Sequence, residues 1–345
     1  MNKMKVLLAS MRHSYGDLGL GLSYEYYNLL LPIQNLVERP LFFDYMEEIQ
    51  AVGREAMNRR LLALVESECP DVVIVTPFQN ELDPEVMDAI RQRALTVAYF
   101  FDDSWRVEFS QFWARHFSYV TTSDINGTRT FAAAGIHNVI YSPFASNTRL
   151  YGRHDLPKIY AVTFVGQYHP YRDWCLACLR RAGYDVRVWG PGWKTGILDH
   201  ESMVAVFNQS RINLNLSNCV SWDLRYLLWS PRGQRPWRAF RNNWAALRTR
   251  DVKTREMVKG RHFEINSCGG FQLSFYAEGL ERHYQIGEEI AIFASVEDLV
   301  DKVRYYLANP DDCERIAHLG YTRTLQDHSM EKRLTDLFLA LGLTK

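Results

Sequence analysis

Hydrophobic residues along this chain gather into short runs, and the segments between the runs carry apolar residues at helical spacing. In the first half the runs predict β-strands at 6–10, 40–43, 72–75, 96–101, 119–122 and 139–141. The segments between them predict helices at 24–36, 47–67, 84–93, 105–115 and 124–134. Strands that alternate with helices are typical of βαβ units, so we expect this half to form a parallel sheet.

The same alternation restarts after a polar stretch at 145–158, which we interpret as an interdomain linker. Strands are predicted at 160–165, 186–189, 212–216, 271–274 and 289–293, and helices at 296–308, 311–323 and 329–341. We therefore expect an α/β protein with two doubly wound, Rossmann-like domains facing a cleft. The expected divisions are an N-terminal domain at 1–150, a C-terminal domain at 151–327 and a C-terminal helix at 328–345.

Composition narrows the class of protein. A chain of 345 residues exceeds one typical core, and Lys+Arg 40 equals Asp+Glu 40, so charge gives no argument for nucleic acid. The N-terminus lacks a signal-peptide pattern, and no apolar run approaches the roughly 20 residues of a membrane span. Six scattered cysteines fit reduced thiols, and Cys175 and Cys178 are expected to pack in a helix rather than bind zinc. A cytoplasmic protein is expected.

The segment from 259 to 273 carries the strongest functional signal. Its pattern predicts a short, half-buried helix that ends at two glycines, with Glu264 in the first turn and two cations in the loop before it. A helix N-terminus beside cations suits a diphosphate, and a carboxylate one turn in suits the hydroxyls of a ribose. A surface carboxylate in an ordinary βα unit is the alternative. The residues predicted to contact such a ligand are Lys259, Arg261, Glu264, Gly269 and Gly270.

Three further strand ends in the C-terminal half add candidates for the same site, because ligands of doubly wound sheets bind beyond the carboxyl ends of the strands. Gly166 follows one strand, and Arg172 is expected in the first turn of the next helix, where the helix dipole also attracts phosphate. Gly190 opens a Gly-Pro-Gly turn that would border a nucleobase, and Ser217 ends the following strand. A helix-surface arginine is the alternative for Arg172.

The N-terminal half offers candidates for proton transfer. His13 follows the first strand, and Asp102 and Asp103 end the fourth, so each is a candidate general base. The alternative for Asp103 is a cap on the following helix. No Asp-x-Asp pattern is present, and we expect neither a metal nor another cofactor.

The loop after the first strand is glycine-rich, but it lacks the Gly-x-Gly-x-x-Gly spacing of a dinucleotide site. Gly19 and Gly21 are expected to let its backbone face the cleft, with Tyr24 on the acceptor side. A flexible connecting loop is the alternative.

The order of these motifs resembles the GT-B glycosyltransferases, most closely their spore-maturation, CgeB-like branch. The resemblance is carried by Phe-Val-Gly with a basic residue shortly after, Val-Trp-Gly-Pro-Gly, Asn-Leu-Asn-Leu-Ser and Phe-Glu-x-x-x-Cys-Gly-Gly. The motif Phe-Phe-Asp-Asp-Ser in the first half is also typical of these enzymes, and the resemblance covers nearly the whole chain apart from about 220–256. The resemblance implies a hexosyltransferase-like enzyme that moves a sugar from a nucleotide-sugar such as a UDP-sugar to an acceptor hydroxyl, without a metal. A nucleotide-sugar epimerase or hydrolase, and a non-catalytic nucleotide- or glycan-binding protein, are the alternatives.

Only some of the functional residues of related enzymes have a matching residue in this chain. In related retaining enzymes two carboxylates lie seven residues apart, and the second, matched by Glu264, binds the donor ribose. Met257 stands where the first would be, beside Glu256. The usual Arg-x4-Lys phosphate pair falls on Gln167 and Arg172, so one cation remains. The donor and the stereochemical outcome therefore stay open.

The segment at about 220–256 has no counterpart in the resemblance. It holds four of the nine Trp, and from 223 to 256 nine Arg or Lys stand against three acids. A helix from Pro236 to about Arg248 would place Trp237 and Trp244 on one face, as acceptor-side candidates. One interpretation is an arm that packs on its own domain or on a second subunit of a homodimer. The other is a docking surface for an anionic acceptor, or for a membrane leaflet that carries a lipid-linked glycan acceptor, at the inner face of the membrane.

Overall fold

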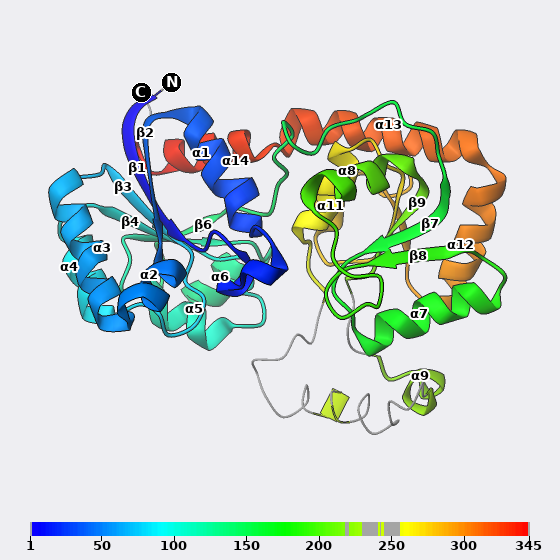
Figure 1. The fold of residues 1–345 in the computed structure, drawn as a ribbon, viewed down its shortest axis with the longest axis horizontal. Coiled ribbons are helices and arrows are strands. Elements are labelled where there is room, and N and C mark those ends of the chain that lie inside the picture. The colour runs from blue at the N-terminus through cyan, green and yellow to red at the C-terminus, as the bar shows by residue number, and fades with distance from the viewer. Residues whose placement is uncertain (1, 218–220, 230–240, 242, 245–255, 344–345) are drawn as a thin grey trace. The chain divides into compact units, whose positions relative to one another are not determined.

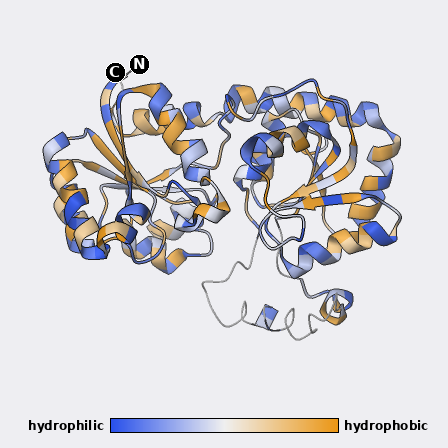
Figure 2. Cartoon of the chain, in the orientation of Figure 1, coloured by the Kyte–Doolittle hydropathy of each residue, from blue (hydrophilic) through white to orange (hydrophobic). Residues whose placement is uncertain are grey.

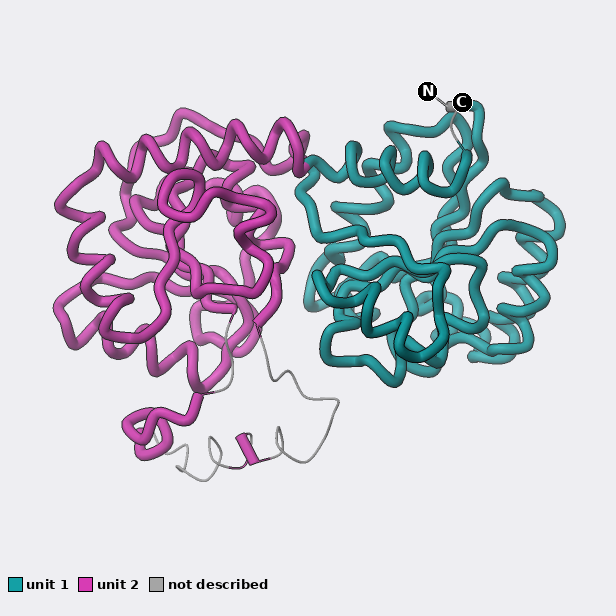
Figure 3. The backbone as a smooth tube through the Cα atoms, turned by 180° about the vertical axis from the view of Figure 1, so that it is seen from behind, with its two compact units in different colours: residues 1–147, 329–345 teal, residues 148–328 magenta. Residues whose placement is uncertain are grey.

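The chain forms two compact units, described here from a computed structural model that covers residues 2–217, 221–229, 241, 243–244 and 256–343. Unit 1 comprises residues 1–147 and 329–345, and unit 2 comprises residues 148–328 (Figure 3). The chain passes between them twice, and the first passage lies within the predicted linker at 145–158. The C-terminal helix, which was predicted as a separate segment at 328–345, is part of unit 1.

Unit 1 is built on a six-stranded parallel sheet with the strand order β2-β1-β3-β4-β5-β6. The strands are β1 (Asn2–Ser10), β2 (Val37–Asp44), β3 (Val72–Val75), β4 (Leu95–Tyr99), β5 (Tyr119–Thr122) and β6 (Val139–Tyr141). Each lies where its apolar run predicted a strand. The strand order reverses beside β1, which is where doubly wound sheets place their ligands.

Helices cover both faces of this sheet (Figure 1). They are α1 (Leu31–Leu36), α2 (Tyr45–Val52), α3 (Arg54–Glu68), α4 (Pro84–Arg91), α5 (Val107–Ala114), α6 (Gly127–Ala132) and α14 (Met330–Ala340). Along β1, Leu7 and Ala9 pack in one core against α3 and α4, whereas Val6 and Leu8 pack in the other against α1 and α14. Burial on both faces explains why central strands such as β3 are continuous apolar runs. The edge strand β2 instead includes exposed Glu38 and Arg39, and Figure 2 colours each residue by its hydropathy.

Unit 2 has a five-stranded parallel sheet with the order β11-β10-β9-β7-β8. The strands are β7 (Tyr160–Val165), β8 (Val186–Trp189), β9 (Ser210–Asn215), β10 (Gln272–Phe275) and β11 (Ala291–Phe293). The helices are α7 (Pro170–Arg181), α8 (His200–Gln209), α9 (Leu224–Leu228), α11 (Gly260–Ser267), α12 (Val296–Ala308) and α13 (Pro310–Asp327). Helices α7 and α12 cover one face, and α8 and α11 cover the other. The expected pair of α/β domains is confirmed.

Several predicted helices differ in their bounds. The expected helix at 47–67 is two helices, because Gly53 adopts a φ of 80° that ends α2 before α3 begins. The expected helix at 24–36 starts with a π-helical turn, Tyr26–Leu30, before α1. The helix expected from 105 begins at Val107, so Arg106 rather than Asp103 occupies its N-cap position.

Part of the predicted insertion at 220–256 is described. Helix α9 is held on α7 by Tyr226, whose buried ring lies 5.0 Å from that of Tyr171 and 5.7 Å from that of Trp174. Trp244 is exposed. Trp237 and most of the helix predicted at 236–248 lie outside the described residues. Within the described part of the chain, no helix is long and apolar enough to cross a bilayer.

Candidate functional site

The topology of unit 2 gathers most of the predicted ligand-binding residues at one edge of its sheet. Gly166 and Ser217 follow the carboxyl ends of β7 and β9, which are neighbours where the strand order reverses. Helix α7 starts just after β7, and α11 precedes β10, so both helix N-termini lie at that same edge. This is the edge at which doubly wound sheets bind ligands.

Helix α11 is more deeply buried than the sequence suggested. Seven of its residues, from Gly260 to Ser267, are buried, whereas a half-buried helix was expected. Arg261, expected in the preceding loop, is the second residue of the helix, and Glu264 is the fifth. The expectation was wrong because the helix begins at Gly260, three residues before the apolar Phe263 on which the prediction rested.

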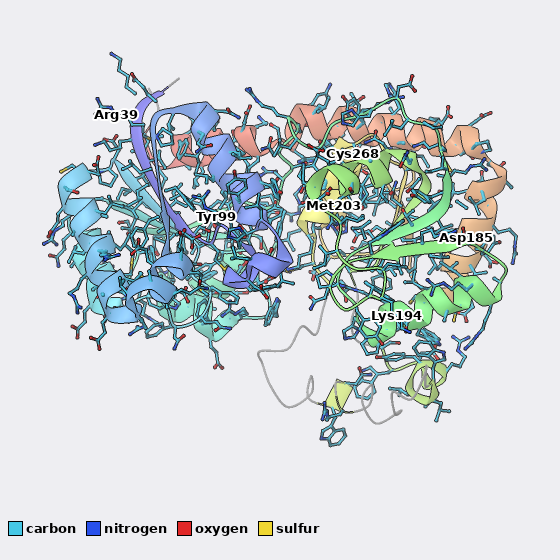
Figure 4. The ribbon with its side chains drawn as sticks, in the orientation of Figure 1. Arg39, Tyr99, Asp185, Lys194, Met203 and Cys268 are labelled. Atoms are coloured by element: carbon cyan, nitrogen blue, oxygen red, sulfur yellow. The ribbon has the colours of Figure 1, made fainter. Side chains whose placement is uncertain are left out.

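Glu264 and Arg261 form an ion pair along one face of α11. The Arg261 Nη1 atom lies 2.8 Å from Glu264 Oε2, and the two side chains are 27% and 5% exposed. Nη1 also lies 3.0 Å from the Sδ atom of Met203, and the guanidinium carbon is 5.2 Å from the centre of the Phe207 ring. Met203 lies on α8 (Figure 4). The nearby His200 has its pKa lowered, chiefly by burial and partly by the charge of Arg261.

His262, which the sequence analysis missed, fixes the start of α11. Its Nδ1 atom accepts a hydrogen bond of 3.0 Å from the backbone N–H of Lys259, so Nε2 donates to Ser274 Oγ at 3.1 Å. The imidazole is fully buried. This bond ties the predicted diphosphate-binding end of α11 to β10. A buried histidine of this kind has no signature in a single sequence, because its partner is twelve residues away on another element.

Gly269 and Gly270 end α11 in a Schellman motif. Gly269 adopts a φ of 64° and its N–H donates to Asn266 O, while the N–H of Gly270 donates to Ile265 O. A Cβ atom on Gly270 would lie 2.8 Å from Asn213 Nδ2. The shape of the helix end and its contact with β9 therefore require both glycines.

Gly166 and Gly190 let the ends of β7 and β8 approach closely. Gly190 has a φ of 134°, and a Cβ atom there would collide with the Gly166 carbonyl group. That carbonyl accepts a hydrogen bond of 2.8 Å from Trp193 Nε1. Arg172 lies in the first turn of α7, as predicted, and its Nη1 donates to Gln167 O at 2.7 Å. The loops after β7 and β8 thus pack against each other beside the site.

Asp103 is buried at the carboxyl edge of the unit 1 sheet and does not cap a helix. Its carboxylate accepts hydrogen bonds from the Thr122 hydroxyl and, at 3.0 Å, from the Ser123 hydroxyl. Burial raises the pKa of Asp103 to about 6, although these hydrogen bonds act in the opposite direction. Asp103 therefore holds the loop after β5 against the end of β4.

Asp102 has an acidic neighbour that the sequence analysis missed. Burial, and to a lesser extent the negative charge of Asp102, raise the pKa of Glu25. Burial and the charges of both carboxylates also raise the pKa of Tyr15, whose ring lies 5.5 Å from that of Phe78. Glu25 could not be singled out from the sequence, because nothing there shows that the helix after the first loop begins beside the end of β4.

The other predicted residues of unit 1 lie in or next to the loop after β1. His13 pairs with Leu22 across this loop, which Gly21 closes with a φ of 77°. Gly19 is in a turn of 3-10 helix, and its N–H donates to Asp17 Oδ1 at 2.8 Å. Tyr24 is half-buried, and its hydroxyl donates to Ala145 O at 2.8 Å. The loop therefore folds into turns that its own hydrogen bonds hold together.

Within the described residues, no group of three or more His, Cys, Asp or Glu side chains is placed to hold a metal ion.

The stability of unit 1 is expected to depend on pH through Asp103. Because its folded pKa of about 6 exceeds its ordinary value, the folded state retains a proton between about pH 4 and pH 6 that the unfolded state has lost. Stability therefore falls as pH rises through this window, by up to about 3 kcal/mol. Urea unfolding of the parent and of Asp103→Asn should show a stability difference that changes by about this amount between pH 4 and pH 7. A difference that is the same at both pH values would contradict the assignment.

Comparison with known proteins supports an enzymatic role for unit 2. Residues 172–338 match the model of a family described as "Glycosyl transferase-like", and these residues contain Arg172, Arg261 and Glu264. Among curated protein sequences none matches the chain.

Solved structures match the whole chain in fold. HepE from Anabaena, solved in complex with UDP and glucose, has a TM-score of 0.65 at 11% identity, over 99% of this chain and all of that chain. Sucrose-phosphate synthase from Thermosynechococcus elongatus has a TM-score of 0.62 at 9% identity, over 98% and 99% of the two chains. A glycosyltransferase from Rickettsia africae gives 0.61 at 8%, over 99% and 98%. The chain thus has the GT-B glycosyltransferase fold, and residues 172–338 match a glycosyltransferase-like family model.

Proposed function

We propose that this chain, with its GT-B fold and glycosyltransferase-like C-terminal part, transfers a sugar from a nucleoside diphosphate to an acceptor hydroxyl. The observation that carries the proposal is Glu264, which lies within the matched region on a buried helix at the ligand-binding edge of unit 2. The carboxylate forms an ion pair with Arg261 through Oε2. We assign to its other oxygen, Oε1, a hydrogen bond from a ribose hydroxyl. HepE, which shares the fold, was solved with UDP, and we propose a UDP-sugar as the donor.

The chemistry requires stabilisation of the departing nucleoside diphosphate, whose negative charge grows in the transition state. Fixed cations and backbone N–H groups at helix N-termini supply this stabilisation where the charge develops. We assign it to Arg172 in the first turn of α7, to the first turn of α11 and to Lys259 at its N-cap position. No metal is needed in this proposal.

Proton transfer from the acceptor hydroxyl is assigned to the carboxyl edge of the unit 1 sheet. Asp102 and His13 are the candidate bases. Glu25 is a third candidate, because its pKa is raised by burial and by the neighbouring Asp102. The carboxylate of Asp103 is already engaged by Thr122 and Ser123, so its proposed contribution is to hold Asp102 in position.

A thermal-shift screen with UDP-, GDP-, dTDP- and CMP-linked sugars tests the proposal. A ligand present at 100 times its dissociation constant stabilises a protein by about 2.7 kcal/mol, so one nucleotide class should raise Tm clearly. Product analysis with and without acceptor then separates the alternatives. Donor turnover without acceptor would identify an epimerase or hydrolase, and binding without turnover a non-catalytic protein.

The insertion at 220–256 is proposed to bind the acceptor rather than the donor. Its described residues expose large apolar side chains, and the segment is rich in cations. The exposed side chains are Trp222, Leu224, Leu228 and Trp244. An apolar, cationic surface suits an anionic or lipid-linked acceptor. We propose that the enzyme is a cytoplasmic member of the CgeB-like branch that works at the inner face of the membrane.

Replacing Leu224 and Leu228, which are 71% and 76% exposed on α9, with Ser should raise the acceptor KM and leave the donor KM unchanged. Tyr226 on the same helix is fully buried, so Tyr226→Ala is a control that should lower Tm instead. Co-sedimentation with anionic vesicles at low salt separates a membrane surface from a soluble acceptor. An acceptor KM equal to that of the parent would contradict an acceptor role, and a dimer disrupted by the Ser substitutions would support a subunit interface.

A further inference from the structure

Arg261 was a candidate ligand of the donor diphosphate, but its surroundings favour a different role. The side chain lies three residues before Glu264 on the same face of α11, and Nη1 is 2.8 Å from Oε2. Nη1 also contacts Met203 at 3.0 Å, and the guanidinium lies 5.2 Å from the Phe207 ring centre. The guanidinium is therefore held between α8 and α11 and directed at the carboxylate.

Burial gives this ion pair its significance. Glu264 is only 5% exposed, and burying a carboxylate without a counter-charge is energetically costly. Within the described residues Arg261 is the one cation that forms an ion pair with it. Arg261 thus supplies the counter-charge and holds the Oε2 atom in one position.

The pair is also electrically neutral. An arginine whose charge is balanced by a carboxylate 2.8 Å away adds little net attraction for a dianionic diphosphate. Arg172 and Lys259 are the cations that the proposed function assigns to the diphosphate.

We propose that Arg261 is a positioning residue, which orients Glu264 toward the two ribose hydroxyls of the donor and does not itself bind the diphosphate. The proposal rests on the proposed function, because it assumes that Glu264 binds a ribose. It predicts that Arg261 increases the affinity for the donor only by strengthening the contact between Glu264 and the ribose, and not by any contact with the phosphates.

Titration of the full chain with UDP and with uridine, which has no phosphate, tests the proposal. Arg261→Met keeps the side-chain length but removes the charge. It should weaken binding of UDP and of uridine by the same factor, roughly tenfold to a hundredfold. The difference in affinity between UDP and 2′-deoxy-UDP should shrink in parallel. Arg261→Met combined with Glu264→Gln should be no weaker than Glu264→Gln alone, because both changes remove one interaction.

Arg261→Lys keeps the proposal testable if Arg261→Met does not fold. Lys restores the charge but not the planar fork, so it should recover part of the affinity for UDP and for uridine together. Loss of UDP affinity with uridine affinity unchanged would overturn the positioning role and make Arg261 a phosphate ligand, and the proposed function would stand. Failure of the parent to bind any nucleotide in the screen would overturn the proposed function and this role with it.

Discussion

Removing residues 329–345 is expected to unfold unit 1, although the segment lies at the opposite end of the chain. On α14, Met330, Leu334, Leu337 and Phe338 are each at most 2% exposed and pack in the core beneath β1, β3 and β4. Burying four such side chains stabilises the fold by about 6–12 kcal/mol, which is comparable to the total stability of a domain. Circular dichroism and limited proteolysis should show the loss of unit 1.

Point substitutions on the same helix supply the matched control. Leu334 is fully buried and Leu339 is 56% exposed. Leu334→Ala should destabilise the protein by about 2–5 kcal/mol, whereas Leu339→Ala should change stability by no more than about 0.5 kcal/mol. A truncated chain with a folded, protease-resistant unit 1 would contradict the role of α14.

Glu264→Ala is expected to remove most donor binding and turnover. The substitution leaves the ribose hydroxyls unpaired and deprives Arg261 of its counter-charge, and each unpaired buried polar group costs about 1–3 kcal/mol. The affinity for the nucleotide should therefore fall by about one to two orders of magnitude. Calorimetric titration and initial-rate measurements on the same preparation give both quantities.

Asp185→Ala is the control for this substitution, because Asp185 precedes β8 at the amino edge of the same sheet (Figure 4). Its side chain is 66% exposed. The control should bind and turn over the donor as the parent does. If Glu264→Ala also binds every nucleotide as the parent does, the assignment of the site is wrong.

The strands and the ligand-binding edge could be predicted from the sequence for a physical reason. A central strand buried on both faces is apolar along most of its length, so strands such as β3 and β4 appear as runs, whereas the edge strand β8 alternates. The parallel arrangement then determines which strand ends share an edge. Gly166, Arg172 and Ser217 could be assigned to one edge without knowledge of any contact.

The contacts between elements could not be predicted in the same way. The ion pair of Arg261 depends on where the first turn of α11 begins, and the apolar pattern from Phe263 onward indicated a later start. The neighbourhood of Glu25 and Asp102 joins residues 77 positions apart, and His262 binds a serine on another strand. The break at Gly53 and the place of α14 in unit 1 likewise depend on tertiary packing, which local propensity does not report.

The central claim is that the nucleotide part of the donor binds at the N-terminus of α11, and a crystal structure with the nucleoside diphosphate found in the screen tests it most directly. The account predicts that both ribose hydroxyls lie within hydrogen-bond distance of the Glu264 carboxylate, with the diphosphate near Arg172 and the first turn of α11. A nucleotide bound at the carboxyl edge of the unit 1 sheet, or bound in unit 2 with its ribose away from Glu264, would contradict the account.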